Sequence, residues 1–147
     1  MGGIIVNRHK IEKEIVAVLL SKKQINSVLS AALEALRKEQ AKRYGPWKHE
    51  SFWETICDRL IEARKEPGVV PPEQRGWNTS GNEVVIILLS RRQVNRLFSS
   101  VGDRVELVKE RNKSYLVRQQ SMVEEEKYWD DIWDIVVVAE KAPAVTV

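Results

Sequence analysis

The feature that most constrains this chain is a stretch of sequence that occurs twice. Residues 14–30 read EIVAVLLSKKQINSVLS and residues 83–99 read EVVIILLSRRQVNRLFS, with eight of the seventeen positions identical. A second pair follows, FWETI at residues 52–56 and YWDDI at residues 128–132. The first pair is offset by 69 residues and the second by 76. An internal repeat sets the unit of folding, so the sequence predicts two similar halves.

Each repeat begins with a short apolar run rich in β-branched residues, which favours a buried strand. Ser21 and Ser90 end these runs, and each is followed three residues later by a glutamine, Gln24 or Gln93. This is the spacing of a capping box, in which the two side chains bond to the first backbone amides of a helix. Apolar residues at spacings of three and four then predict two helices after each strand.

The predicted fold class is α+β and helix-rich, with a strand–helix–helix unit used twice and packed with pseudo-twofold symmetry. Because a lone strand would leave backbone amides unpaired, we expect the two strands to pair and the helices to cover their apolar face. The predicted boundaries are 1–66 for the first repeat, 67–81 for a Pro/Gly linker, 82–141 for the second repeat and 142–147 for a flexible tail.

Two segments stay open in this prediction. Residues 102–120 are either a continued helix, whose apolar stripe then includes Tyr115 and Leu116, or a strand hairpin. Residues 3–6, GIIV, are the candidate for a further strand.

The composition is that of a globular protein, with 43% apolar and 31% charged residues. No apolar run approaches the roughly 20 residues that a membrane span needs. The N-terminal residues also lack the long apolar core of a secretory signal. We therefore expect a cytoplasmic protein, located in the host cytoplasm if it is viral, with no membrane partner.

A pair of basic residues opens the first predicted helix of each repeat. The helix dipole disfavours a cation there by about 0.3–1 kcal/mol, so a ligand is one reason for the choice. Helix amides beside two cations suit a phosphate group. Solvated side chains whose stems cover apolar surface are the alternative explanation. The candidate anion-binding residues are Lys22, Lys23, Arg91, Arg92, Ser21 and Ser90.

Tryptophans are the candidates for an interface with a partner protein. Three of them occur at helical spacing with Ile and Leu, for which core packing is the alternative. Another, Trp77, lies in the linker, where we expect it to dock on one of the halves. The candidate interface residues are Trp53, Trp77, Trp129 and Trp133.

No motif in the sequence indicates catalysis. Cys57 is the single cysteine, and it shares a predicted helical face with Leu60, so we expect a buried core residue. His9 and His49 are far apart and give no metal-ligand spacing. We therefore expect no enzyme activity, no catalytic residue, no cofactor and no metal.

An apolar strand, a Leu-Ser-x-x-Gln helix start and a Trp-bearing second helix together resemble small phage or prophage accessory proteins. The residues that carry the resemblance are LSKKQ at 20–24 and LSRRQ at 89–93. The resemblance implies a protein that blocks a host macromolecule or sequesters a small signal.

The leading functional hypothesis is a non-catalytic binding protein, a viral or accessory inhibitor or adaptor, that occupies a surface on a partner protein. The alternative is an anion-binding module for nucleic acid or a phosphorylated nucleotide. Self-association is a further possibility. A protein interface predicts an exposed apolar patch of a few hundred Å², whereas an anion site predicts both basic pairs on one face.

Overall fold

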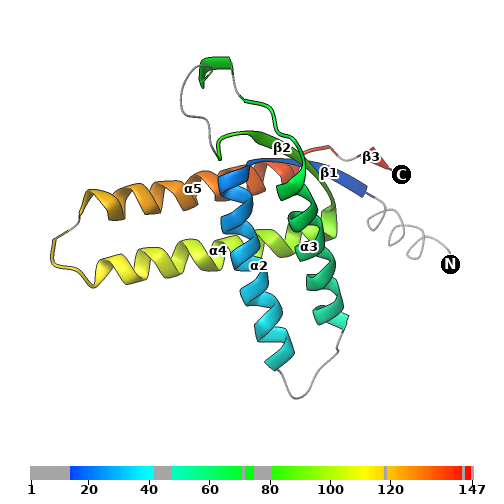
Figure 1. Cartoon of the computed structure of the whole chain (residues 1–147). Helices are drawn as coiled ribbons and strands as arrows, with labels where there is room; N and C mark the ends of the chain where they lie inside the picture. The colour runs from blue at the N-terminus through cyan, green and yellow to red at the C-terminus, as the bar shows by residue number, and fades with distance from the viewer. Residues whose placement is uncertain are drawn as a thin grey trace.

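The computed structural model describes residues 14–41, 48–70, 72–74, 81–117, 119–143 and 145–146. Within this part of the chain the protein is helix-rich, and one strand followed by two helices occurs in each half (Figure 1). Trp77, His9 and the candidate strand at residues 3–6 lie outside the described residues. The elements are β1 (Glu14–Ser21), α2 (Lys22–Ala41), α3 (Lys48–Lys65), the 3-10 helix η1 (Pro72–Gln74), β2 (Val84–Ser90), α4 (Arg91–Lys113), α5 (Gln120–Lys141) and β3 (Val145–Thr146).

The sheet is antiparallel and has the strand order β2–β1–β3. β1 and β2 pair along nearly their whole length, so the predicted pairing of the two repeated strands is confirmed. In this register Val18 lies opposite Ile87. These two residues are themselves 69 positions apart, and therefore occupy the same place in the two repeats.

The segments that follow α3 and α5 also join the sheet. Val69 and Val84 exchange backbone hydrogen bonds of 2.9 and 2.8 Å, and Val145 pairs with Ile15. The sequence interpretation made these segments a linker (67–81) and a flexible tail (142–147), because it ended each repeat with the second helix. The spacing Lys-x-Pro-x-Val, at residues 65–69 and again at 141–145, is the signal that it missed.

The core lies between one face of the sheet and the helices. Every second residue of β1 and β2 is buried, and the residues between them are mostly exposed. α3 packs on β2 and α5 packs on β1, so the second helix of each half rests on the strand of the other half. The buried strand residues are Val16, Val18, Leu20, Val85, Ile87 and Leu89.

Equivalent positions in the two halves are buried to the same degree. Positions are equivalent when they are 69 residues apart in the strand and first helix, or 76 residues apart in the second helix. Each member of the following pairs is at most 3% exposed. Both halves therefore use the same helix faces to build one shared core. The pairs are Ile25 and Val94, Val28 and Leu97, Ala32 and Val101, Ile56 and Ile132, Leu60 and Val136, and Ala63 and Ala139.

Both predicted capping boxes are present. The Ser21 amide donates to the Gln24 side chain at 2.9 Å, and the Gln24 amide donates to the Ser21 hydroxyl at 3.1 Å. Ser90 and Gln93 make the same two bonds at the same two distances. The cap ends each strand and starts the next helix, which is why the strand–helix boundaries follow from the sequence.

The open question about residues 102–120 is decided in favour of a helix. α4 continues through Gly102 to Lys113, and a turn then leads to α5. The turn begins at Ser114, whose hydroxyl donates to the Arg111 carbonyl oxygen at 2.7 Å. The residues after it have left the helix, so the prediction that Tyr115 and Leu116 continue the apolar stripe is wrong.

Candidate interaction surfaces

The two basic pairs lie at opposite ends of the sheet. β1 and β2 run antiparallel, so the helices that follow them start roughly 20 Å apart, at about 3.4 Å per residue. At the first of these starts, the amides of Lys22 and Lys23 already donate to the carbonyl oxygens of Glu83 (3.0 Å) and Gly81 (2.9 Å). The predicted anion site is therefore not assembled as one surface, and these two amides are occupied.

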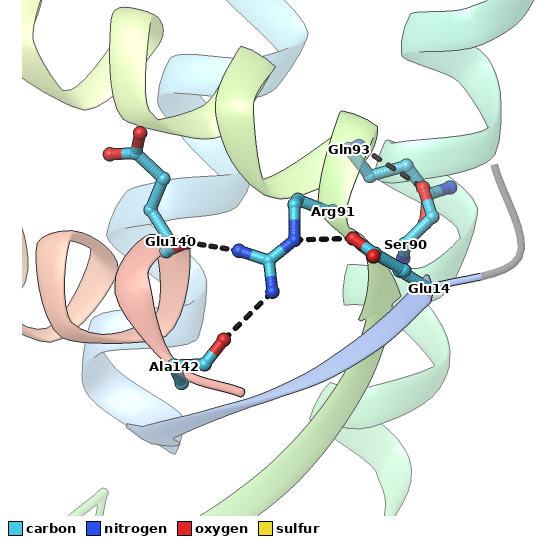
Figure 2. Close-up of polar contacts among 6 residues, drawn as sticks. All are labelled: Glu14, Ser90, Arg91, Gln93, Glu140 and Ala142. Atoms are coloured by element: carbon cyan, nitrogen blue, oxygen red, sulfur yellow. Dashed lines mark hydrogen bonds and ion pairs between the residues drawn. The ribbon is translucent and has the colours of Figure 1, made fainter. Parts of the chain in front are cut away.

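The Arg91 side chain links three parts of the fold (Figure 2). Its guanidinium forms an ion pair with the Glu14 carboxylate at 2.7 Å. It also donates to the carbonyl oxygen of Glu140 and, at 2.7 Å, to that of Ala142. These carbonyls belong to the end of α5, where the helix dipole favours a cation. Arg91 therefore holds the end of α5 against the start of β1 and is not available to a ligand.

The second residue of each basic pair packs on an aromatic ring from the other half. The Lys23 ammonium lies 5.6 Å from the centre of the Tyr128 ring, and the Arg92 guanidinium lies 5.2 Å from that of Phe52. The Tyr128 hydroxyl also donates to the Lys23 carbonyl oxygen at 3.1 Å and shares a hydrogen bond of 2.7 Å with the Ser27 hydroxyl. Burial raises the pKa of Tyr128. These contacts join the two halves of the molecule.

The described tryptophans belong to the core. Trp53 and Trp129 are 7% and 8% exposed. Trp133 is partly buried and stacks on Phe98, with 4.2 Å between the ring centres. Their helical spacing with Ile and Leu places them on the covered faces of α3 and α5, so these three are not exposed contact residues. Trp77 lies outside the described residues.

Cys57 is buried, as the sequence predicted. Burial, together with the nearby carboxylates of Asp58 and Glu54, raises the pKa of the Cys57 thiol to about 11. A thiol of this kind stays protonated near neutral pH and is a poor nucleophile.

Among the described residues no cluster of three or more His, Cys, Asp or Glu side chains could hold a metal ion. No helix in the described ranges is long and apolar enough to cross a bilayer.

A cleft of about 410 Å³ lies where α2 and α4 meet, with Trp53 among its lining residues. Within it Arg104 forms an ion pair with Glu34, and Lys38 lies 3.8 Å from the same carboxylate. Acidic and basic side chains line the cleft in equal numbers, so it favours neither an anion nor a cation. The charged lining residues are Glu34, Glu39, Asp103, Lys38, Arg96 and Arg104.

α4 and α5 form a long helical hairpin that projects away from the sheet, referred to below as the arm (Figure 1). Ion pairs cross between its two helices, from Lys109 to Asp130 at 3.1 Å and from Arg111 to Glu125. Near its end the side-chain amide of Asn112, which is only 5% exposed, donates to the Met122 carbonyl oxygen at 3.5 Å. The arm is therefore held together by contacts between its own two helices.

Three successive apolar residues stand at the end of this arm. Tyr115, Leu116 and Val117 are 54%, 104% and 75% exposed, and they are called the arm tip below. None of these side chains is part of the core or packs against it. The sequence interpretation missed them as site residues because it considered only a helix stripe or a strand hairpin for residues 102–120. The run of apolar residues after Asn112-Lys113-Ser114 was the available signal.

The face of the sheet opposite the helices is also apolar, and no described helix covers it. Leu19 and Ile86, which lie opposite each other, are 52% and 59% exposed, and Leu88 is 53% exposed. One apolar face was expected from the sequence, but the runs in β1 and β2 are apolar at nearly every position, and the helices cover only one side. The residues of this open sheet face are Ala17, Leu19, Val69, Val84, Ile86 and Leu88.

Comparisons with protein-family models, with curated proteins and with solved structures found no match. A function therefore has to be argued from the surfaces of this chain. Among the described residues, the arm tip and the open sheet face are the two surfaces where large exposed apolar side chains are neighbours, along the chain in one case and across the sheet in the other.

Proposed function

We propose that this chain is a non-catalytic binding protein, an inhibitor or adaptor, that occupies a surface of a partner protein with its arm tip. The observation that carries the proposal is the complete exposure of Leu116 between two further exposed apolar residues. Successive exposed apolar residues oppose solubility, and they add nothing to a hairpin that its own ion pairs and core hold together. Binding is the physical reason to keep them.

A projecting apolar tip fits a concave apolar pocket on the partner. Tyr115 brings a large ring and a hydroxyl that can bond at the pocket edge, a combination enriched at interface centres. Arg111 and Lys113 stand at the base of the tip, each in an ion pair with a glutamate of the arm. Such exposed pairs contribute little to affinity but form the polar rim that surrounds an apolar anchor.

The test compares the same change at two exposed leucines of the arm, Leu116→Asp at the tip and Leu107→Asp further down α4. Leu107 is 54% exposed, so neither change should alter circular dichroism or the melting temperature. Loss of a central apolar anchor typically costs about 2 kcal/mol or more, so we expect Leu116→Asp to weaken capture of the partner roughly 30-fold.

The measurement is affinity capture from an extract of the source cells, followed by titration of the purified complex. Wild type and Leu107→Asp should recover the same partner with equal affinity, and Leu116→Asp should not. Equal recovery by all three proteins would contradict the proposal.

We also infer that the two halves derive from one duplicated unit and are related by a pseudo-twofold axis between Val18 and Ile87. Three observations support this inference: the repeated element order, the matched burial of equivalent residues, and the reciprocal packing of α3 on β2 and α5 on β1. On this inference the α2–α3 hairpin is a second arm, whose end at residues 42–47 lies outside the described residues.

A further inference from the structure

We propose that the open sheet face binds a second copy of this chain, so that two sheets stack face to face in a twofold dimer. This surface lies at the base of the arms, and the proposal does not depend on the partner of the arm tip. It starts from the burial pattern of β1 and β2, in which the residues between the buried ones carry exposed apolar side chains.

The chemistry of the face is that of the inside of a sheet sandwich. Leu19 lies opposite Ile86, and Ala17 lies opposite Leu88, so the centre of the face consists of two rows of aliphatic side chains. None of the six residues that define the face is ionisable. The face is therefore suited to the usual packing of two sheets about 10 Å apart, with interleaved aliphatic side chains.

Charge opposes a second copy of the same chain less at this face than where basic side chains are exposed. The protein has a net charge of +3, and two copies repel each other where basic side chains meet. Arg59, at the edge of β2, directs its guanidinium to the Leu88 carbonyl oxygen, with N···O distances of 3.3 and 3.1 Å, and also pairs with Glu62. The Glu62 carboxylate therefore offsets the charge of Arg59 within its own chain, which weakens its repulsion of a second copy.

The arrangement of the side chains is also compatible with a twofold contact. Leu19 and Leu88 occupy equivalent positions in the two repeats, and so do Ala17 and Ile86. Similar groups therefore lie on either side of the line between Val18 and Ile87. A twofold interface brings the same patch of both copies together, and a patch with similar halves offers matching groups to its copy.

The apolar area of the open sheet face sets the affinity that we expect for the dimer. The exposed parts of these side chains amount to on the order of 500 Å² of apolar surface, at the scale where patches on monomers are commonly functional. A standard stable interface buries about 800 Å² on each partner. The open sheet face reaches a large part of that area but not all of it, so we expect a reversible dimer with a dissociation constant in the micromolar range.

The experiment is sedimentation equilibrium of the full chain from about 1 to about 200 µM. The wild-type mass should rise from 17.0 kDa toward twice that value with concentration. Ile86→Lys and Leu19→Lys each place a charge in the contact, and each should weaken the dimer more than tenfold. Because both residues are more than half exposed, both variants should stay folded by circular dichroism.

Leu107→Lys is the matched control, since Leu107 is as exposed as Leu88 but belongs to α4. It should leave the dimer intact, and so should Leu116→Asp, which separates this proposal from that of the arm tip. A wild-type protein that stays at 17.0 kDa over the whole range would overturn the proposal. A dimer that survives both sheet substitutions would overturn it as well, because the contact would then use another surface.

Discussion

The two halves of the molecule build the same core but fill one part of it in opposite ways. The first half has Leu33 on its first helix and Cys57 on its second, and the equivalent positions of the second half hold Gly102 and Trp133. A Cβ atom on Gly102 would lie 2.7 Å from Cζ3 of Trp133, so only glycine fits there. The larger side chain stands on the first helix in one half and on the second helix in the other. What the two halves share is a filled volume and not a set of residues.

The halves also differ in the length of their helices. α4 and α5 have 23 and 22 residues, whereas α2 and α3 have 20 and 18. The sheet and the helix parts beside it match closely, and the additional length lies toward the arm tip. The matching part is therefore the scaffold, and the part that differs carries the exposed residues on which the proposed function rests.

The largest effect on stability is expected at Gly102 and Trp133, where the two halves place the larger side chain on different helices. Gly102→Leu should lower the free energy of unfolding by about 3 kcal/mol, because the new side chain collides with Trp133. Adding Trp133→Cys recreates the first-half combination, so the double variant should lose at least about 1 kcal/mol less than the sum of the two single losses. Urea denaturation measures all three.

Ser99→Leu, at an exposed position of the same helix, is the control and should change stability by less than about 0.5 kcal/mol. Strictly additive losses in the double variant would show that Gly102 and Trp133 are not coupled, and the comparison of the two halves would fail at this point.

An intermediate loss of stability is expected at Arg91, the first residue of α4, and not at the equivalent residue Lys22. Arg91→Ala should destabilise the protein by about 2 kcal/mol, since it removes charge-assisted hydrogen bonds and leaves the half-buried Glu14 carboxylate unpaired. At the equivalent position, Lys22 forms no ion pair with any described residue, and Lys22→Ala should cost less than about 0.5 kcal/mol. Thermal unfolding of both variants checks this. Equal losses would mean that the Arg91 contacts contribute nothing specific.

The smallest effect is a pH dependence that belongs to the first half. The pKa of the Cys57 thiol is about 11 in the folded protein, above its ordinary value of 9.0. As the pH rises above about 9, the unfolded state releases this proton first, so stability should fall toward pH 11. Trp133, the equivalent residue, does not titrate.

Urea midpoints measured at neutral pH and near pH 10 should therefore differ more for wild type than for Cys57→Ala. Tyr128, whose pKa is also raised, should contribute a fall of the same sign in both proteins. Identical pH profiles would exclude Cys57 as the source.

The elements that follow from the sequence are those that local residues determine. The capping boxes at Ser21 and Ser90 set the strand–helix boundaries, and their bonds span only three residues. The pairing of β1 with β2 could also be predicted from the sequence, because unpaired buried amides are costly. The helical spacing of Trp53 with Ile56 allowed either a core or an interface, and the structure places Trp53 in the core.

The candidate surfaces were harder to predict because they depend on what remains uncovered. The runs in β1 and β2 are apolar on both faces, and periodicity alone does not say which face the helices take. The arm tip depends on where α4 ends, and that end is set by the turn at Ser114 and by the contact of Asn112 with Met122 on the next helix.

The strands of one half pair with those of the other half, and this has a consequence for the synthesis of the protein on the ribosome. β1 obtains both of its neighbours, β2 and β3, from the second half, and α5 completes its packing. While the chain is being made, β1 must wait for β2 on one side and, much later, for β3 on the other, and until then its unpaired edges are open to other chains. We expect folding to be slow for so helical a protein, since its decisive contacts are distant in sequence, and a nascent chain stalled halfway should need a chaperone.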